Sequence, residues 1–185
     1  MLNGLEEYIN EVILHKQYVL EGAKIMSDYL ISIDKYDTAV ELINRCSLHD
    51  NSKFLREEMI RLLAIKDKSD FRDPSKLLTD EKKRAIRYHW ANNRHHPEYF
   101  DDITEMTDLD LMEMACDCFA RSLQYNTDFL SFIEIRQRER FKFPDDIYQK
   151  YYNYCCILDV NYKLSKHDDT AKVKTITFNW LNMVL

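Results

Sequence analysis

Apolar residues recur at intervals of three and four along most of the chain, which is the period of an amphipathic helix. The first such run predicts a helix over about residues 3–31, with one buried face formed by Tyr8, Val12, His15, Val19, Gly22 and Met26. Gly22 lies on this face although glycine weakens a helix, so we expect another helix to cross closely at that position.

Later runs with the same period predict further helices over about 34–48, 52–63, 79–92, 107–123, 128–140 and 144–164. The expected apolar positions of the second and third helices are Tyr36, Ala39, Val40, Ile43 and Cys46, then Phe54, Met59, Ile60, Leu62 and Leu63. The polar, proline-containing segments 66–78 and 93–99 are predicted loops. Residues 172–180 alternate apolar and polar side chains, which indicates a short strand or an extended strap.

Several of these helices are preceded by side chains that can accept hydrogen bonds from a first helical turn. The predicted caps of the second, third and fourth helices are Asp34 or Asp37, Ser52 and Thr79. Thr107, with Asp110 three residues later, resembles a capping box at the start of the next helix. These signals fix where helices begin more tightly than the apolar period does.

Composition favours helices over strands, because the 185 residues include only 2 Gly and 3 Pro. Apolar residues make up 45% and charged residues 31%, as is ordinary for a globular chain long enough to bury a core. The expected architecture is therefore all-α: one domain over residues 1–185, built as a bundle of about six to seven helices.

Charge and cysteine content exclude some functions and suggest a setting. The net charge of −6 makes nucleic acid an unlikely partner, and no apolar run approaches the ~20 residues that cross a membrane. The first residues lack the features of a signal peptide, and the 5 Cys residues show no CxxC spacing. We therefore expect a cytoplasmic protein, in the host cytoplasm if the gene is viral.

Histidine and aspartate positions carry the chemistry. Five of the 6 His residues fall between positions 15 and 96. His49 and Asp50 are adjacent at the predicted end of the second helix, where the chain can turn both side chains toward one point. A single buried His is more often a satisfied core residue than a ligand, but here several must be explained together. Imidazole and carboxylate together suit Mn, Fe, Zn, Co or Ni, so a divalent transition-metal site is predicted.

The order His, His-Asp, Asp on successive helices and the run His49-Asp50-Asn51-Ser52-Lys53-Phe54 resemble the HD-domain superfamily of metal-dependent phosphohydrolases. With His89, the segment 93–99 and the segment 113–117 included, residues 8–125 resemble a small uncharacterised bacterial and phage family, domain of unknown function 5662. The resemblance implies an HD-like bundle in which residues 8–125 form the core that carries the motifs. Residues 126–185 would then supply additional C-terminal helices.

The resemblance also implies roles for individual residues. A first metal ion would be held by His15, His49, Asp50 and Asp117, and Asp50 could bridge to a second ion. His89 with one or both of His95 and His96 would bind that second ion, and Lys53 would neutralise a substrate phosphate. His89 and His95 are closer in sequence than the usual binuclear ligands, so His95 and His96 have an alternative catalytic role, contacting substrate or acting as an acid.

The function expected from this pattern is hydrolysis of a small phosphorylated molecule, such as a nucleotide or cyclic nucleotide, with one or two metal ions. Arg94 and Arg121 are further candidates for neutralising phosphate, while Glu98 and Glu113 either orient a ligand His or are solvated. Two alternatives remain: a di-iron oxygenase on the same scaffold, and a non-catalytic helical interaction protein with a structural metal. A homodimer is possible through aromatic residues late in the chain.

Overall fold

The computed structural model describes residues 2–63 and 80–167, and these two ranges contain helices and turns but no strand. In chain order the elements are α1 (Leu2–Ser32), α2 (Tyr36–Leu48), the 3₁₀ turn η1 (Asn51–Phe54), α3 (Arg56–Leu63), α4 (Asp80–Asn92), the 3₁₀ turns η3 (Pro97–Tyr99) and η4 (Ile103–Glu105), α5 (Asp108–Tyr125), α6 (Phe129–Phe132), the π-helical turn η5 (Ile133–Gln137), α7 (Arg138–Phe141) and α8 (Asp145–His167). The all-α prediction is thus confirmed. The predicted loop 66–78, the cap Thr79 and the extended segment 172–180 lie outside the described residues.

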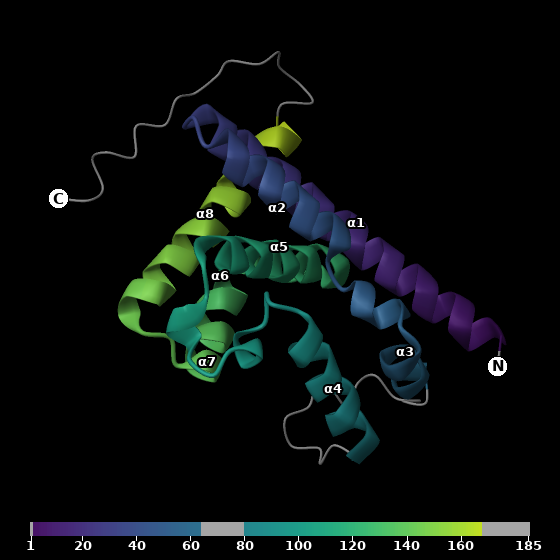
Figure 1. Ribbon diagram of the computed structural model, residues 1–185. Helices are drawn as coiled ribbons and strands as arrows, with labels where there is room; N and C mark the ends of the chain where they lie inside the picture. Colours follow the sequence, from purple (N-terminus) through teal and green to yellow (C-terminus); the bar gives the residue numbers. More distant parts are fainter. Residues whose placement is uncertain (1, 64–79, 168–185) are drawn as a thin grey trace.

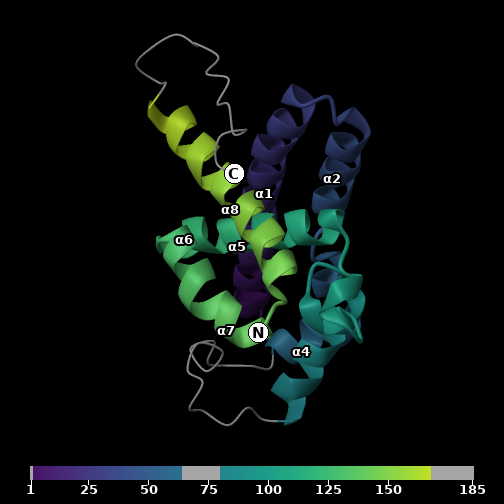
Figure 2. The same cartoon turned by 90° about the vertical axis from the view of Figure 1, so that its left-hand side faces the viewer.

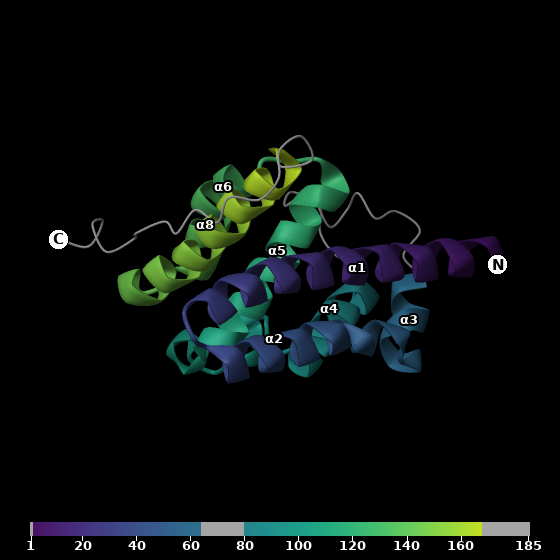
Figure 3. The ribbon, with the colours of Figure 1, turned by 90° about the horizontal axis from the view of Figure 1, so that it is seen from above.

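The bundle is organised around α5, which packs against α1 and α8 and also contacts α2. Figure 1 shows α5 crossing beneath the long α1, and Figure 2 shows α1 and α2 side by side as an antiparallel pair. The view from above places α3 and α4 together at the end of this pair that lies nearer the N-terminus (Figure 3). None of the helices in the described ranges is long and apolar enough to cross a membrane.

The core lies where α1, α2, α5 and α8 meet. Among its most completely buried apolar side chains are Val19, Ala23, Met26, Leu42, Leu111, Cys116, Tyr151, Cys155 and Leu158. The predicted buried face of α1 is confirmed along its whole length, including His15 at 2% exposure. His15 is thus a buried polar residue within an apolar stripe, which indicates that α1 has a role beyond packing.

Gly22 marks a close approach of α1 to α5, as its position on the buried face predicted. A Cβ added there would lie 3.1 Å from Phe119 Cδ1 and 3.5 Å from the Cα of Cys116. Gly4 on the same helix has nothing within 4 Å of the corresponding position. The two glycines therefore differ in packing although both lie in α1.

We expect Gly22→Leu to lower the free energy of unfolding by about 1–3 kcal/mol or more, because the added side chain has no space between α1 and α5. Gly4→Leu is the matched control and should leave stability unchanged or slightly higher, since leucine is the better helix former. Urea unfolding monitored by circular dichroism measures both. Equal effects of the two substitutions would contradict the close-crossing explanation.

The buried face of α2 differs from the predicted one. Tyr36 and Val40 are 57% and 62% exposed, whereas Ala39, Leu42 and Cys46 are buried. The apolar stripe of α2 is wider than the face that its neighbours cover, and α1 and α5 cover the flank that contains Leu42. The expected burial of Tyr36 and Val40 is therefore wrong.

The third helix also differs, because its apolar residues are not its most buried ones. Phe54 precedes the helix and is 38% exposed, and Ile60 is 49% exposed. The one fully buried residue among those described in α3 is Glu58, at 0% exposure. A carboxylate thus takes the innermost position of α3.

Two of the predicted caps are wrong and one is confirmed. The N-cap of α2 is Lys35, without a side-chain hydrogen bond, because the chain enters α2 through a tight turn in which Asp34 has a positive φ of 61°. Ser52 lies buried within η1 and accepts a hydrogen bond from Asn93 Nδ2 at 2.8 Å, and α3 begins four residues later. The capping box of Thr107 and its partner three residues on is present at the start of α5.

Candidate metal centre

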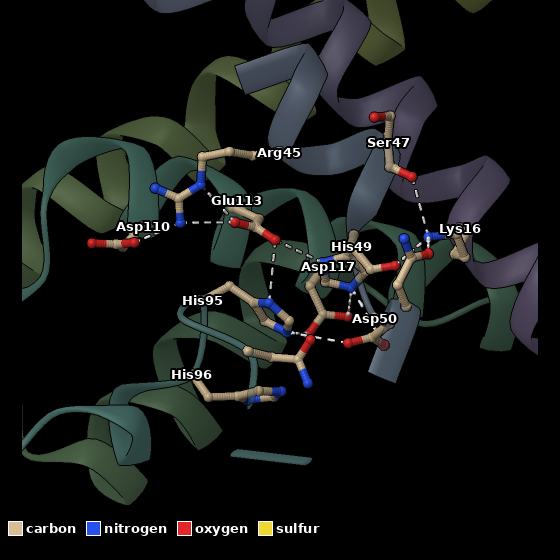
Figure 4. A network of polar contacts seen from close by, with 12 residues as sticks. Lys16, Arg45, Ser47, His49, Asp50, His95, His96, Asp110, Glu113 and Asp117 are labelled. Atoms are coloured by element: carbon tan, nitrogen blue, oxygen red, sulfur yellow. Dashed lines mark hydrogen bonds and ion pairs between the residues drawn. The ribbon is translucent and has the colours of Figure 1, made fainter. Parts of the chain in front are cut away.

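The His49-Asp50 pair lies where α2 ends, in a turn that points both side chains inward. His49 leaves the helix with ψ of 133°, and Asp50 follows in the left-handed region with φ of 56°, which aspartate tolerates better than most residues. Lys16 on α1 holds this turn by donating hydrogen bonds to the Ser47 carbonyl at 3.2 Å, the His49 carbonyl, and Asn51 Oδ1 at 2.7 Å (Figure 4). The geometry expected of adjacent His and Asp at a helix end is therefore present.

One side of the Asp50 carboxylate faces α1 and α5. Asp50 Oδ2 lies 3.4 Å from His49 Nε2 and 3.8 Å from His15 Nε2. Asp117 Oδ1, on α5, lies 2.9 Å from His15 Nε2 and 3.8 Å from His49 Nε2. These four residues form what we call the first ligand group: His15, His49, Asp50 Oδ2 and Asp117 Oδ1.

The other side of the same carboxylate faces α4 and the segment that follows it. Asp50 Oδ1 lies 3.4 Å from His89 Nε2 and 3.6 Å from His95 Nε2. His96 Nε2 lies 2.8 Å from His89 Nε2. We call this the second ligand group: Asp50 Oδ1, His89, His95 and His96. Asp50 therefore contributes one oxygen to each group.

The donor atoms fit a bound metal ion in spacing and in lack of other partners. Ligands about 2.1 Å from one ion lie about 3.0–3.4 Å from each other, close to the spacings seen in both groups. Each of the sets His15, His49 and Asp50, and Asp50, His89, His95 and His96, offers ligand atoms within 4.8 Å of one another. Within the described residues, the buried Nε2 atoms of His15, His49 and His95 have no hydrogen-bond partner, nor do Asp50 Oδ1 and Asp117 Oδ1. These buried His and Asp groups could hold a metal ion.

The protonation states are mostly those that metal ligands need. Burial, with the nearby charge of Arg121, lowers the pKa of His15 to about 3. Burial also lowers the pKa of His95 and His96, and neighbouring His residues add to this effect. Burial opposes ionisation of Asp50, but positive charge at His49 and Lys53 holds the pKa of its carboxyl well below the usual range.

His49 is the exception among the predicted ligands. Its burial disfavours the charged form, but the Asp50 carboxylate beside it outweighs this and raises the pKa of His49 to about 10. A proton therefore occupies His49 at neutral pH in the metal-free protein. A cation entering the first ligand group would take over the role of that proton.

Glu113 orients two of the His residues from behind. Its Oε1 lies 3.1 Å from His49 Nδ1 and 3.3 Å from His95 Nδ1, so both rings turn Nε2 toward the carboxylates of the site (Figure 4). Arg45 donates to Glu113 Oε2 at 3.0 Å and to Asp110 Oδ1 at 2.5 Å. Of the two roles considered for Glu113, the structure places it as the orienting carboxylate.

The other acidic candidate, Glu98, lies elsewhere. Its Oε1 accepts a hydrogen bond from Arg140 at 2.6 Å, which ties η3 to α7. The contact positions the segment that carries His95 and His96 rather than a ligand ring. Glu98 is therefore a structural partner of α7 and no part of the cluster.

The cations proposed for substrate phosphate fall into two kinds. Lys53 Nζ donates to Asp50 Oδ2, and Arg121 Nε lies 3.7 Å from Asp117 Oδ1, so both lie beside ligand carboxylates. Arg94 instead pairs with Asp110 at 3.2 Å and is stacked over the rings of two neighbouring aromatic residues. Lys53 and Arg121 border the site, while Arg94 serves the packing around it.

The sequence pattern did not predict that two further residues, Glu58 and Lys16, lie at this site. Glu58 Oε1 lies 2.9 Å from His89 Nδ1, although α3 looked like an ordinary surface helix. The available signal was weak: Glu58 stands at an apolar spacing between Leu55 and Leu62. Lys16 directly follows a predicted ligand, but nothing in the sequence shows that its side chain reaches the end of α2.

Comparison with known proteins identifies a family without a described activity. Residues 4–172 match the model of a family described as a family of unknown function, DUF5662. Neither the curated proteins nor the solved structures gave a significant match. The match includes every residue of both ligand groups. It extends to residue 172, well past residues 8–125, over which the sequence resembles this family. Because it spans most of the chain, the protein belongs to the DUF5662 family.

Proposed function

We propose that this protein is a metal-dependent phosphohydrolase of the HD type, acting on a small phosphorylated molecule. The observation that carries the proposal is the two-sided Asp50: Oδ2 faces the Nε2 atoms of His15 and His49, and Oδ1 faces those of His89 and His95. Within the described residues, three of these four nitrogens, those of His15, His49 and His95, are buried without a hydrogen-bond partner. A mixed set of imidazole and carboxylate ligands favours Mn, Fe, Zn, Co or Ni over Mg or Ca. Two ions, one for each ligand group, fit the arrangement best.

The charge around the cluster supports bound cations. Four carboxylates gather there, those of Asp50, Glu58, Glu113 and Asp117, and each is buried or nearly so. Burying this much negative charge is unfavourable without compensating positive charge. In the metal-free protein this charge is offset by Lys53, Arg121 and the protonated His49, and partly by Arg45, which also pairs with Asp110. A metal ion in the first ligand group would replace the proton of His49 and supply a larger positive charge.

The chain provides access and charge for a small anionic substrate. The side chains of His89 and Asp117 are each 15% exposed and that of Lys53 is 12% exposed, whereas His15, His49 and His95 are buried. A substrate approaching the cluster would meet these three partly exposed side chains, and the Lys53 ammonium can neutralise a phosphoryl oxygen. When bound, a divalent ion supplies Lewis acidity, which makes water a stronger nucleophile and polarises the phosphoryl group.

The positions of His95 and His96 favour ligand roles in this proposal. His95 is 1% exposed and its Nε2 faces both Asp50 and Asp117. The lowered pKa of His96 keeps it neutral at pH 7, which suits a ligand better than an acid. Lys53 then remains as the proposed catalytic residue that contacts substrate.

The test is to purify the protein without chelator or a histidine tag, measure bound metals by mass spectrometry, and assay nucleotides and cyclic nucleotides with each candidate metal. We expect hydrolysis that depends on the metal and is lost with chelator. Lys53→Gln should retain the metal while kcat/KM falls at least tenfold, because the ammonium that would neutralise the phosphate is replaced by a neutral amide that can still donate to Asp50 Oδ2. Absence of metal from wild type, even after soaking with each ion, would overturn the proposal.

A di-iron oxygenase is the second candidate, supported by the same observation of a carboxylate shared between two His-rich groups. Metal identity separates the two: iron as the only bound metal, with oxygen consumption and no phosphate release, favours the oxygenase. A third outcome, tightly bound metal with neither activity, would indicate a structural site in an interaction protein.

A further inference from the structure

Glu58 is a fully buried acidic residue that has no role in the proposed mechanism. It lies on α3 at 0% exposure, and neither of its carboxylate oxygens has a hydrogen-bond partner in the described ranges. Among the described residues, His89 approaches it closely, with Nδ1 2.9 Å from Glu58 Oε1. A buried carboxylate in this position requires a compensating donor, and His89 is at the distance to supply it.

The hydrogen bonds of Asn93 show which nitrogen of His89 faces Glu58 as a donor. Asn93 Nδ2 donates to the His89 carbonyl at 2.7 Å and to Ser52 Oγ at 2.8 Å, which uses both of its protons. The 3.2 Å approach of the same amide nitrogen to His89 Nδ1 is therefore not a donated hydrogen bond. His89 Nδ1 is left free to carry a proton toward the Glu58 carboxylate.

We propose that Glu58 is the positioning residue of the second ligand group, fixing His89 with Nδ1 protonated and the Nε2 lone pair directed at Asp50 Oδ1. The proposal rests on the function proposed above, because it assumes that an ion occupies this group. Glu58 acts through His89 and touches neither the ion nor the substrate. Its Oε1 contacts Nδ1, on the opposite side of the imidazole from Nε2, which lies 3.4 Å from Asp50.

The assignment adds a second orienting carboxylate to the site. Glu113 on α5 contacts Nδ1 of His49 and His95, and Glu58 on α3 contacts Nδ1 of His89. A carboxylate behind a ligand His fixes its tautomer and raises its basicity, and its loss typically weakens metal affinity about 10–100-fold. This effect should be confined to the second group when Glu58 is changed.

The experiment titrates metal-free protein with Co²⁺ and follows binding by visible absorption and isothermal titration calorimetry. Wild type should take up two ions. Glu58→Leu should bind the first ion with unchanged affinity and the second about 10–100-fold more weakly. Glu58→Gln keeps a hydrogen-bond acceptor without the charge. Its affinity for the second ion should lie between those of wild type and Glu58→Leu. Glu57→Gln on the exposed face of the same helix is the control and should match wild type.

The outcomes separate this inference from the proposed function. If wild type binds no Co²⁺, the metal-dependent function fails. If wild type binds two ions and Glu58→Leu binds both with wild-type affinity, only the role of Glu58 fails. A merely structural role would lower the melting temperature of metal-free Glu58→Leu without a selective loss of one ion. Selective weakening of one ion in a folded variant establishes the positioning role.

Discussion

Asp50→Ala is expected to abolish metal binding in both ligand groups at once, with at least a 100-fold loss of affinity at each. Asp50 is the only residue common to the two sets, with Oδ2 facing His15 and His49 and Oδ1 facing His89 and His95. Removing its side chain takes one ligand from each group and the link between them. Metal content measured by mass spectrometry after purification without chelator should fall from two ions per chain to none.

Thermal stability gives an independent measurement of the same loss. A ligand present at 100 times its dissociation constant stabilises the folded state by about 2.7 kcal/mol, so wild type should melt at a higher temperature when Co²⁺ is added. Asp50→Ala should show no such increase. Asp28→Asn removes one negative charge from an exposed position on α1 and should respond to Co²⁺ as wild type does.

Two His variants test whether Asp50 divides the site as the distances indicate. His15→Ala should lose the ion of the first ligand group, and His89→Ala should lose the ion of the second, so that each retains one. Loss of both ions in either variant would contradict two separable groups. Retention of both ions by Asp50→Ala would contradict its place at the centre of the site.

The parts of the fold that were predictable are those controlled by local sequence. The α1 stripe is long enough for its period to define one buried face, and the capping box at Thr107 depends on residues only three apart. The α2 face was mispredicted because a short apolar stripe can be buried on either flank. Contacts with α1 and α5 bury Leu42 and leave Val40 exposed, and sequence spacing alone does not contain those contacts.

The site shows the same division between local and long-range information. The turn of His49 and Asp50 follows from the end of a helix, so its inward geometry could be anticipated. The partners behind the ligands depend on how distant helices pack. Glu113 and Glu98 were equal candidates by sequence, yet Glu113 on α5 contacts His49, whereas Glu98 on η3 pairs with Arg140. Glu58 contacts His89 from α3, which precedes α4 in the sequence.

Glu113→Ala should cause the largest loss of stability among the substitutions near the site, about 3–5 kcal/mol in the free energy of unfolding of the metal-free protein. The side chain accepts from His49, His95 and Arg45, and is 8% exposed. Its removal leaves two buried Nδ1 atoms and part of a guanidinium without an acceptor. Urea unfolding measures the change, and Glu105→Ala at an exposed position serves as the control.

The pH dependence distinguishes this effect from simple loss of packing. Burial opposes ionisation of Glu113, but hydrogen bonds from His49 and His95 hold the pKa of its carboxyl below the usual value. A depressed pKa in the folded state stabilises the protein above the ordinary glutamate pKa of about 4.3, and this contribution is lost as the pH falls. Wild type should therefore lose more stability than the isosteric Glu113→Gln between pH 5 and pH 3. Parallel losses in the two proteins would show that the charge of Glu113 contributes nothing, and that the carboxylate fills space without orienting the two His rings.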